Sequence, residues 1–214
     1  MDNALYRSTS LRRIEAAHAS EPLMQRAGAA AAAWAAELAI QRERPVLVLA
    51  GPGNNGGDAF EAARLLREQF FETCVVFAGD PLSLPADAAA AYRRFSEAGG
   101  TTGNSIPADG QWSLIIDGLF GIGLTRAPAG HYAEWIATAN QLATRDGCPL
   151  LALDCPSGLN VDSGQAFQPC IRASHTITFV AAEPGLLTAE GPDHCGETRV
   201  AGLALTPESE VPAD

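Results

Sequence analysis

The stretch VLVLAGPGNNGGDAFEAARLL, residues 46–66, decides the fold of this chain. Its beginning belongs to a continuously apolar run, Pro45–Ala50, which is typical of a parallel strand buried on both faces. Gly51–Gly57 form a glycine-rich turn, and Asp58–Phe70 carries apolar residues at helical spacing. A strand, a tight turn and an amphipathic helix in this order form the first unit of an α/β fold.

Two helices precede this unit, and strands and helices alternate after it. The preceding helices are Ser8–His18 and a second helix that Ser20 caps and that runs to about Arg44. The strands predicted after it are Cys74–Ala78, Ser113–Asp117, Leu150–Asp154, Ser174–Ala181 and Thr198–Val200, and the helices are Ala86–Ala98 and His131–Thr144. This alternation predicts an α/β fold, a Rossmann-like three-layer αβα sandwich with a mostly parallel central sheet.

The length of the chain predicts a single domain. A chain of 214 residues buries one sizeable core, and we assign residues 1–205 to it. Two loops rich in small and polar residues, Gly99–Gly110 and Val161–Pro169, are interpreted as surface connections within this domain. Residues 206–214 have the sequence TPESEVPAD and are interpreted as an acidic tail or the start of a linker.

The charge balance excludes several classes of function. A net charge of -11 argues against nucleic acid or an anionic membrane as the partner, because nothing would neutralise phosphates over a broad surface. The chain has no lysine, since all 14 of its basic residues are arginine. Schiff-base chemistry, a P-loop lysine and a lysine general base are thereby excluded. A small phosphate-bearing molecule remains compatible, provided that backbone N–H groups at a helix N-terminus hold it.

The cysteines and the hydropathy pattern indicate the compartment. The five cysteines are scattered and form no C-x-x-C pair, and the four histidines do not stand at zinc-ligand spacing from them. We find no signal peptide and no apolar run of transmembrane length. We therefore expect free thiols and a reducing, cytoplasmic location.

Candidate functional residues follow three of the predicted strands. The first strand leads into Gly51–Asp58, another ends at Asp117 before Gly118–Thr125, and a third ends at Asp154 before Cys155–Gly158. Because ligands of open α/β sheets bind beyond the carboxyl ends of the strands, we expect these loops to share one crevice. Two aspartates and a glycine-rich loop in that crevice are the strongest functional signal of the sequence.

The first loop contains G-x-G-x-x-G, at Gly51, Gly53 and Gly56. Between a strand and a helix this pattern is typical of a dinucleotide-binding dehydrogenase, and Asp80, 24 residues after Gly56, would then contact the ribose. A tight turn that needs glycine only for its backbone angles explains the same pattern. Both interpretations stay open on the glycines alone.

The polar residues of this loop are more specific than its glycines. Asn54 and Asn55 offer amides that bind hydroxyl, phosphate or metal, and Asp58 is placed to cap the following helix.

Through this loop and two later motifs, the chain resembles the NAD(P)H-hydrate epimerase family, also called the YjeF N-terminal domain. Residues 46–66 resemble the first motif of that family, Asp117–Leu124 the second, and Leu153–Leu159 the third, in the same order. The likeness runs from Leu23–Gly28 to Pro184–Leu186 and so covers nearly the whole chain.

The resemblance implies a Rossmann-like domain that binds K⁺ and hydrated NADH or NADPH. It implies that Asn55, Asp117 and Ser157 hold the cation, whose hard oxygen ligands these side chains would supply. It implies that the nucleotide is bound by Asn54, Asn55, Gly56, Gly57, Asp58, Gly121, Ile122, Gly123, Leu124, Thr125, Arg126, Ala127 and Asp154. A homodimer, and fusion to or pairing with an ADP/ATP-dependent NAD(P)H-hydrate dehydratase, also follow from the resemblance.

Two positions depart from the family pattern. Ala59 stands where the family usually has glycine, so we expect a less free backbone and a poorer close approach of the ligand. Glu183 stands where relatives commonly carry lysine, and a reversed charge near a phosphate would weaken binding. A non-catalytic binding or scaffold module therefore remains a second hypothesis, beside the dehydrogenase.

The expected reaction inverts the hydroxyl-bearing carbon of the hydrate, which lies next to the ring nitrogen. Asp154 is the candidate acid and base, since burial at a strand end would raise the pKa of its carboxyl. Asp117 suits the cation instead, which would keep it ionised. Loss and return of water, or opening of the ring, are both compatible with the sequence.

Overall fold

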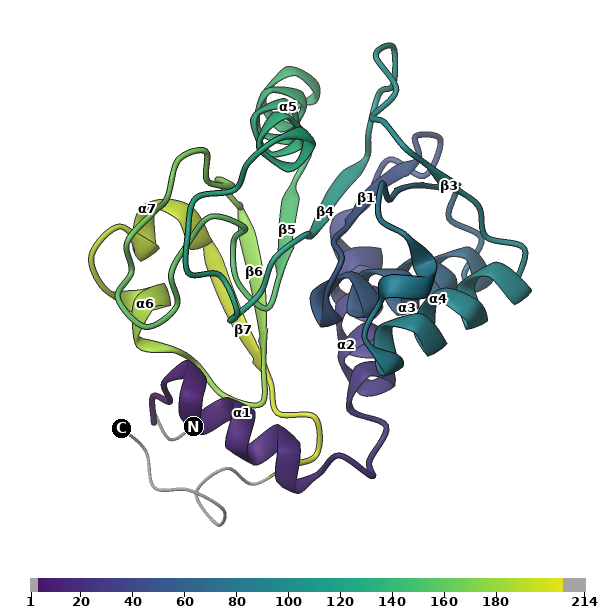
Figure 1. The fold of residues 1–214 in the computed structure, drawn as a ribbon. Coiled ribbons are helices and arrows are strands. Elements are labelled where there is room, and N and C mark those ends of the chain that lie inside the picture. The colour runs from purple at the N-terminus through teal and green to yellow at the C-terminus, as the bar shows by residue number, and fades with distance from the viewer. Residues whose placement is uncertain (1–3, 206–214) are drawn as a thin grey trace.

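The sheet has seven strands, and all of its neighbouring pairs are parallel (Figure 1). The structure is a computed structural model that describes residues 4–205, so the predicted tail at 206–214 lies outside the described residues. The strand order is β3-β2-β1-β4-β5-β6-β7. The strands are β1 Val46–Ala50, β2 Thr73–Val76, β3 Thr102–Gly103, β4 Leu114–Gly118, β5 Leu150–Leu153, β6 His175–Phe179 and β7 Glu197–Ala201.

Helices cover both faces of this sheet. They are α1 Ser8–Ala17, α2 Leu23–Leu38, α3 Asn54–Glu68, α4 Ala86–Glu97, α5 His131–Asp146, α6 Pro184–Leu187 and α7 Gly191–Cys195, with a 3-10 turn at Pro81–Ser83. Val46 and Val48 of β1 join a core with α1 to α4, whereas Leu47 and Leu49 point to the opposite face, toward α5. This alternation confirms the predicted three-layer α/β sandwich. Among the helices of residues 4–205, none combines the length and apolarity that crossing a bilayer requires.

Several predicted boundaries were wrong. Helix α2 begins at Leu23 with Pro22 as its N-cap rather than Ser20, and it ends at Leu38 rather than near Arg44. The polar residues after Leu38 form a turn instead, in which the Arg44 N–H donates to the Gln41 carbonyl before β1 begins. The loop Gly99–Gly110 contributes the two-residue edge strand β3, which sequence patterning does not reveal because the strand is so short.

Helix α3 begins at Asn54, four residues earlier than predicted. Its first turns contain Gly56 and Gly57, and the packing of the helix requires glycine at both positions. A Cβ atom at Gly56 would stand 2.0 Å from the Gly51 carbonyl oxygen, and one at Gly57 would stand 2.5 Å from the sulfur of Met24. The low helix propensity of glycine is overridden by these close approaches. Asp58 is therefore not a cap: the N-cap is Gly53, and no side chain caps the helix.

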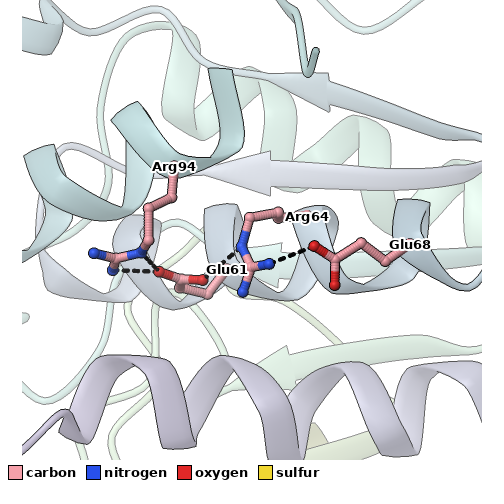
Figure 2. Close-up of polar contacts among 4 residues, drawn as sticks. All are labelled: Glu61, Arg64, Glu68 and Arg94. Carbon is pink, nitrogen blue, oxygen red and sulfur yellow. Dashed lines mark hydrogen bonds and ion pairs between the residues drawn. The ribbon is translucent and has the colours of Figure 1, made fainter. Parts of the chain in front are cut away.

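Helix α3 also carries the fully buried Glu61, whose charge ties it to α4 (Figure 2). Its carboxylate accepts hydrogen bonds from Arg64 Nε at 3.1 Å and from Arg94 Nε, and Arg64 in turn donates to Glu68 at 2.6 Å. A buried carboxylate is costly unless charged partners satisfy it. The arginine of α4 therefore fixes the position of that helix against α3.

We predict that Arg94→Ala destabilises the fold by about 1–3 kcal/mol, because Glu61 stays buried with only one cationic partner. Arg93→Ala is the matched control, since Arg93 is an exposed neighbour on the same helix. Urea unfolding followed by circular dichroism measures the difference in free energy of unfolding. Equal midpoints for the two variants would contradict this role of Arg94.

Candidate functional site

A cavity of about 1020 Å³ lies where the loops after β1, β4 and β5 leave the sheet. Its walls come from α1, from the start of α2, from the first turns of α3, from α4 and from residues 119–126. Parallel strands carry all of their carboxyl ends to one edge, which explains why segments so far apart in the sequence meet there. The predicted shared crevice is therefore present.

Asp117 and Ser157 are joined directly at the base of this region. Asp117 accepts the Ser157 hydroxyl at 2.7 Å on Oδ1 and the Ser157 backbone N–H at 2.8 Å on Oδ2. Oδ1 also accepts the N–H of Leu119 at 3.2 Å. Burial raises the pKa of the Asp117 carboxyl to about 6, although the three hydrogen bonds oppose this rise.

Asn55 is the third residue expected to hold the cation. Its amide nitrogen donates to the Leu153 carbonyl at 3.1 Å, which leaves Oδ1 buried with no hydrogen-bond partner. An orphaned buried carbonyl oxygen is unfavourable by itself and needs a donor or a cation. Amide, carboxylate and hydroxyl oxygens suit a hard cation, so Asn55, Asp117 and Ser157 are chemically fit to hold K⁺.

Asp154, directly after β5, adopts a strained conformation that turns its carboxylate into the cavity. Its φ of 67° lies in the left-handed region, and its Oδ2 accepts the Ile122 N–H at 2.7 Å. Gly121 makes this approach possible, because a Cβ there would stand 2.0 Å from the same oxygen. Burial raises the pKa of Asp154 to about 6 against the lowering by the Ile122 hydrogen bond and by Arg12.

The remaining predicted binding residues divide into two groups. The cavity is lined by Asn54, Asn55, Asp58, Gly121, Ile122, Gly123, Leu124, Thr125, Arg126 and Asp154. Gly56 and Gly57 instead face the protein interior through the close contacts described above, and Ala127 is absent from the cavity lining among the described residues. Asp117 and Ser157 are fully buried just behind this surface.

Two acidic side chains share the cavity with Asp154. Asp58 is buried, and burial together with the charges of Asp154, Glu15 and Glu61 raises its pKa well above the usual range. Glu15 of α1 also lines the cavity, and its side chain is exposed. Burial, followed by the charge of Asp154, raises the pKa of Glu15 to about 7.

Sequence patterning missed the contribution of α1, of the α1–α2 connection and of α4. Glu15 and Arg12 lie on the polar face of an amphipathic helix, where charged residues ordinarily meet only solvent. Pro85, Asp87 and Arg94 of the α4 region line the other side of the cavity. Their spacing in the sequence gives no signal, because only the tertiary fold brings them to the strand ends.

Neither departure from the family pattern faces the cavity. Ala59 is fully buried, and a Cβ at Gly118 would stand 2.5 Å from the Ala59 Cβ, so this methyl group packs on β4. Glu183 is fully buried and accepts the Thr178 hydroxyl at 2.8 Å. Burial raises the pKa of Glu183 well above the usual range, which favours its neutral form. Both side chains are therefore buried away from the cavity lining, and their effects on ligand approach and on phosphate binding stay predictions.

The residue that a dehydrogenase would use to bind the ribose, Asp80, lies away from the cavity. Asp80 is exposed and caps the 3-10 turn, accepting the Leu82 N–H at 3.0 Å. It does not belong to the cavity lining found within residues 4–205.

Comparison with known proteins places the chain among relatives of one kind. The model of the family described as "YjeF-related protein N-terminus" matches residues 20–185. A protein of Achromobacter xylosoxidans named NAD(P)H-hydrate epimerase is 44% identical over 191 residues, which cover 86% of this chain and 88% of that protein. A Bordetella bronchiseptica protein of the same name is 40% identical, over 86% of this chain and 80% of its own length.

Two further matches are to a much longer protein and to a structure of low sequence identity. A Leishmania braziliensis protein named bifunctional NAD(P)H-hydrate repair enzyme is 38% identical over 86% of this chain, which spans only 33% of it. The crystal structure of yeast ynu0, YNL200c, superposes with a TM-score of 0.66 at 19% identity, covering 83% of this chain and 76% of that one. This last match supports the fold alone.

We predict that Asp154→Asn stabilises the fold above pH 6. The pKa of Asp154 is raised from 3.8 to about 6, so the folded wild type loses stability as pH rises through this window, whereas an amide does not ionise. The variant should gain about 1–3 kcal/mol over wild type by pH 7 and nothing below pH 4. Urea unfolding at pH 4 and pH 7 measures this, with the exposed Asp109→Asn as control; an advantage that is equal at both pH values would refute it.

Proposed function

This chain belongs to the family of YjeF-related protein N-terminal domains, and from that premise we propose that it epimerises the R and S forms of hydrated NADH and NADPH in nicotinamide nucleotide repair. The observation that carries the proposal is Asp154, a carboxyl of raised pKa held in the cavity by Ile122 and Gly121. A carboxyl that titrates near neutral pH is suited to give and take protons in turn. The chain is then an isomerase.

We propose that the nucleotide lies along Asn54–Asp58 and Gly121–Ala127. The N-terminus of α3 offers unpaired backbone N–H groups and the positive end of the helix dipole to its phosphates. This mode of binding suits a chain that carries a net charge of -11 and no lysine. Arg12 and Arg126 add positive charge to the same cavity.

We propose that Asn55, Asp117 and Ser157 hold K⁺, on the strength of the orphaned Asn55 oxygen and the buried carboxylate. When bound, the cation supplies positive charge that offsets Asp117 and the phosphates of the nucleotide. Asp117 then stays ionised while Asp154 remains free to exchange its proton. The two aspartates thereby take different roles because their surroundings differ.

Asp154 acts on the hydroxyl-bearing carbon next to the ring nitrogen. Its protonated form donates to the group that leaves, and its ionised form accepts the proton when the bond forms again on the other face. Loss of water and ring opening are both consistent with this role.

The bifunctional Leishmania relatives suggest the setting of the reaction. We propose that the domain works with an ADP/ATP-dependent NAD(P)H-hydrate dehydratase, fused to it or separate, and that it acts as a homodimer in the cytoplasm.

The purified protein, given the R epimer of hydrated NADH with K⁺ present, should convert it to S faster than the uncatalysed reaction. We predict that Asp154→Asn lowers kcat by about 10²–10⁴-fold, since a positioned acid–base group contributes that much. Separation of the epimers by liquid chromatography measures both rates, and Asp109→Asn is the control. Wild-type protein that leaves the epimer ratio unchanged would refute the proposed function, and unimpaired Asp154→Asn would remove that residue from it.

We predict that K⁺ raises the melting temperature of the wild-type protein relative to choline at equal ionic strength, because it binds only the folded state. Asn55→Ala should lose most of this shift, since it removes the unpartnered oxygen. Differential scanning fluorimetry over a K⁺ titration measures the effect. An equal K⁺ response in Asn55→Ala would contradict the ligand set.

A further inference from the structure

Epimerisation by loss and return of water requires proton transfer on both faces of the reacting carbon, and a single carboxyl is poorly placed to serve both. When water leaves the carbon, a planar cation forms, and the new water must arrive at the opposite face. A side chain fixed against one face does not reach a water on the other. Enzymes that invert a carbon centre through a cation-like transition state use two carboxyl groups on opposite faces for this reason. This inference rests on the proposed function.

Helix α1 brings a further carboxyl, that of Glu15, to the cavity from a different element than the loop that carries Asp154. The helix crosses the end of the sheet from which the loops after β1, β4 and β5 emerge (Figure 1). Its N-terminus is anchored by Asp162, which accepts the Ser8 backbone N–H at 2.7 Å and the Ser8 hydroxyl at 2.6 Å. Arg12 donates to the carbonyl of Ile122 at 3.4 Å, and Ile122 is the same residue whose N–H binds Asp154. These contacts hold Glu15 at the cavity that Asp154 also lines.

The side chains around the cavity indicate that it is built for a ligand with hydrogen-bond donors or positive charge. Asp58 is nine-tenths buried, lines the cavity and has no hydrogen-bond or ion-pair partner among residues 4–205. The Glu15 carboxylate, on an exposed side chain that lines the same cavity, also has no partner within the part of the chain that the structure describes. A buried carboxylate that the protein itself leaves unsatisfied is explained by a ligand that completes its contacts.

We propose that Glu15 is a second catalytic residue, which acts on the face of the nicotinamide hydrate opposite to Asp154. Asp154 donates its proton to the hydroxyl as the carbon–oxygen bond breaks, the electron pair leaves with the departing water, and a ring cation remains. A second water adds its oxygen lone pair to the opposite face and gives a proton to Glu15. One water leaves and one enters, and one proton passes from Asp154 to Glu15. In the reverse direction the two residues exchange roles.

The electrostatics of the cavity agree with this pairing. Burial and the charge of Asp154 raise the pKa of Glu15 to about 7, while Arg12 lowers it. The other charged groups that line the same space are Glu21 before α2, Asp58 of α3, Asp87 and Arg94 of α4, and Arg126 of the loop after β4. Two carboxyls that interact in this way share one proton over part of the neutral range, which is the state the mechanism uses.

We predict that Glu15→Gln lowers kcat by at least about 10²-fold in both directions, with KM changed by less than about threefold. The dependence of kcat on pH should be bell-shaped in the wild type, and Glu15→Gln should lose the limb near pH 7. Glu15→Asp, which keeps a carboxyl on a shorter stem, should retain that limb at reduced kcat. Arg13→Gln, an exposed neighbour on the same helix, is the matched control and should behave as wild type.

Three outcomes separate the hypotheses. Wild-type protein without epimerase activity refutes the proposed function, and this inference with it. Active wild type together with Glu15→Gln of similar kcat and an unchanged pH profile refutes the role of Glu15 alone. Combining Glu15→Gln with Asp154→Asn should add little further loss, because the two act as a unit, whereas multiplying losses would show that Glu15 acts only through its charge.

Discussion

The buried carboxylate of Asp117 is the constraint on which the rest of the site depends. It lies in a strand interior with no exposed surface, where a charge is unfavourable unless donors surround it. Those donors come from Ser157 and Leu119, and the Ser157 hydroxyl oxygen in turn accepts the Phe120 N–H at 2.9 Å. Satisfying one aspartate therefore ties the loop after β4 to the loop after β5.

The contact between these two loops determines the conformation of the loop after β4, residues 119–126. Once Phe120 is held by Ser157, Gly121 passes Asp154 so closely that no side chain fits between them, and Ile122 donates to the Asp154 carboxylate. The Ile122 carbonyl then accepts Arg12, so α1 is placed by the same loop. The segment Phe120–Ile122 thus contacts the proposed cation-binding pair, Asp154 and the helix that carries Glu15. The positions of the two proposed acid–base groups are thus set by one framework.

The sequence predicted the parts of this framework that depend on local chemistry. Continuous apolar runs such as Pro45–Ala50 predicted buried parallel strands, and the direction of those strands predicted that Asp117, Asp154 and the Asn54–Asn55 pair would meet. It failed where tertiary packing decides. At the start of α3, Gly56 packs closely on Gly51 and Gly57 packs on Met24 and Ala88, and these contacts override the low helix propensity of glycine. The placement of Glu15 follows from long-range contacts of α1, so the sequence shows only an ordinary polar helix face.

The same carboxyls explain how an acidic chain is suited to a ligand that carries phosphates. Burial raises the pKa of Glu15 to about 7 and of Asp154 to about 6, and it raises that of Asp58 well above the usual range. Near neutral pH these groups carry less negative charge than their number implies, so they repel the phosphates less than fully ionised groups would. The charge of Asp154 adds to the effect of burial on Glu15 and Asp58, and the ring cation of the proposed reaction would be attracted to whichever of these carboxyls is ionised. In the proposed reaction, the cavity therefore stabilises the positively charged ring cation more than the uncharged ring of the ground state. Such a difference in stabilisation is the condition for catalysis.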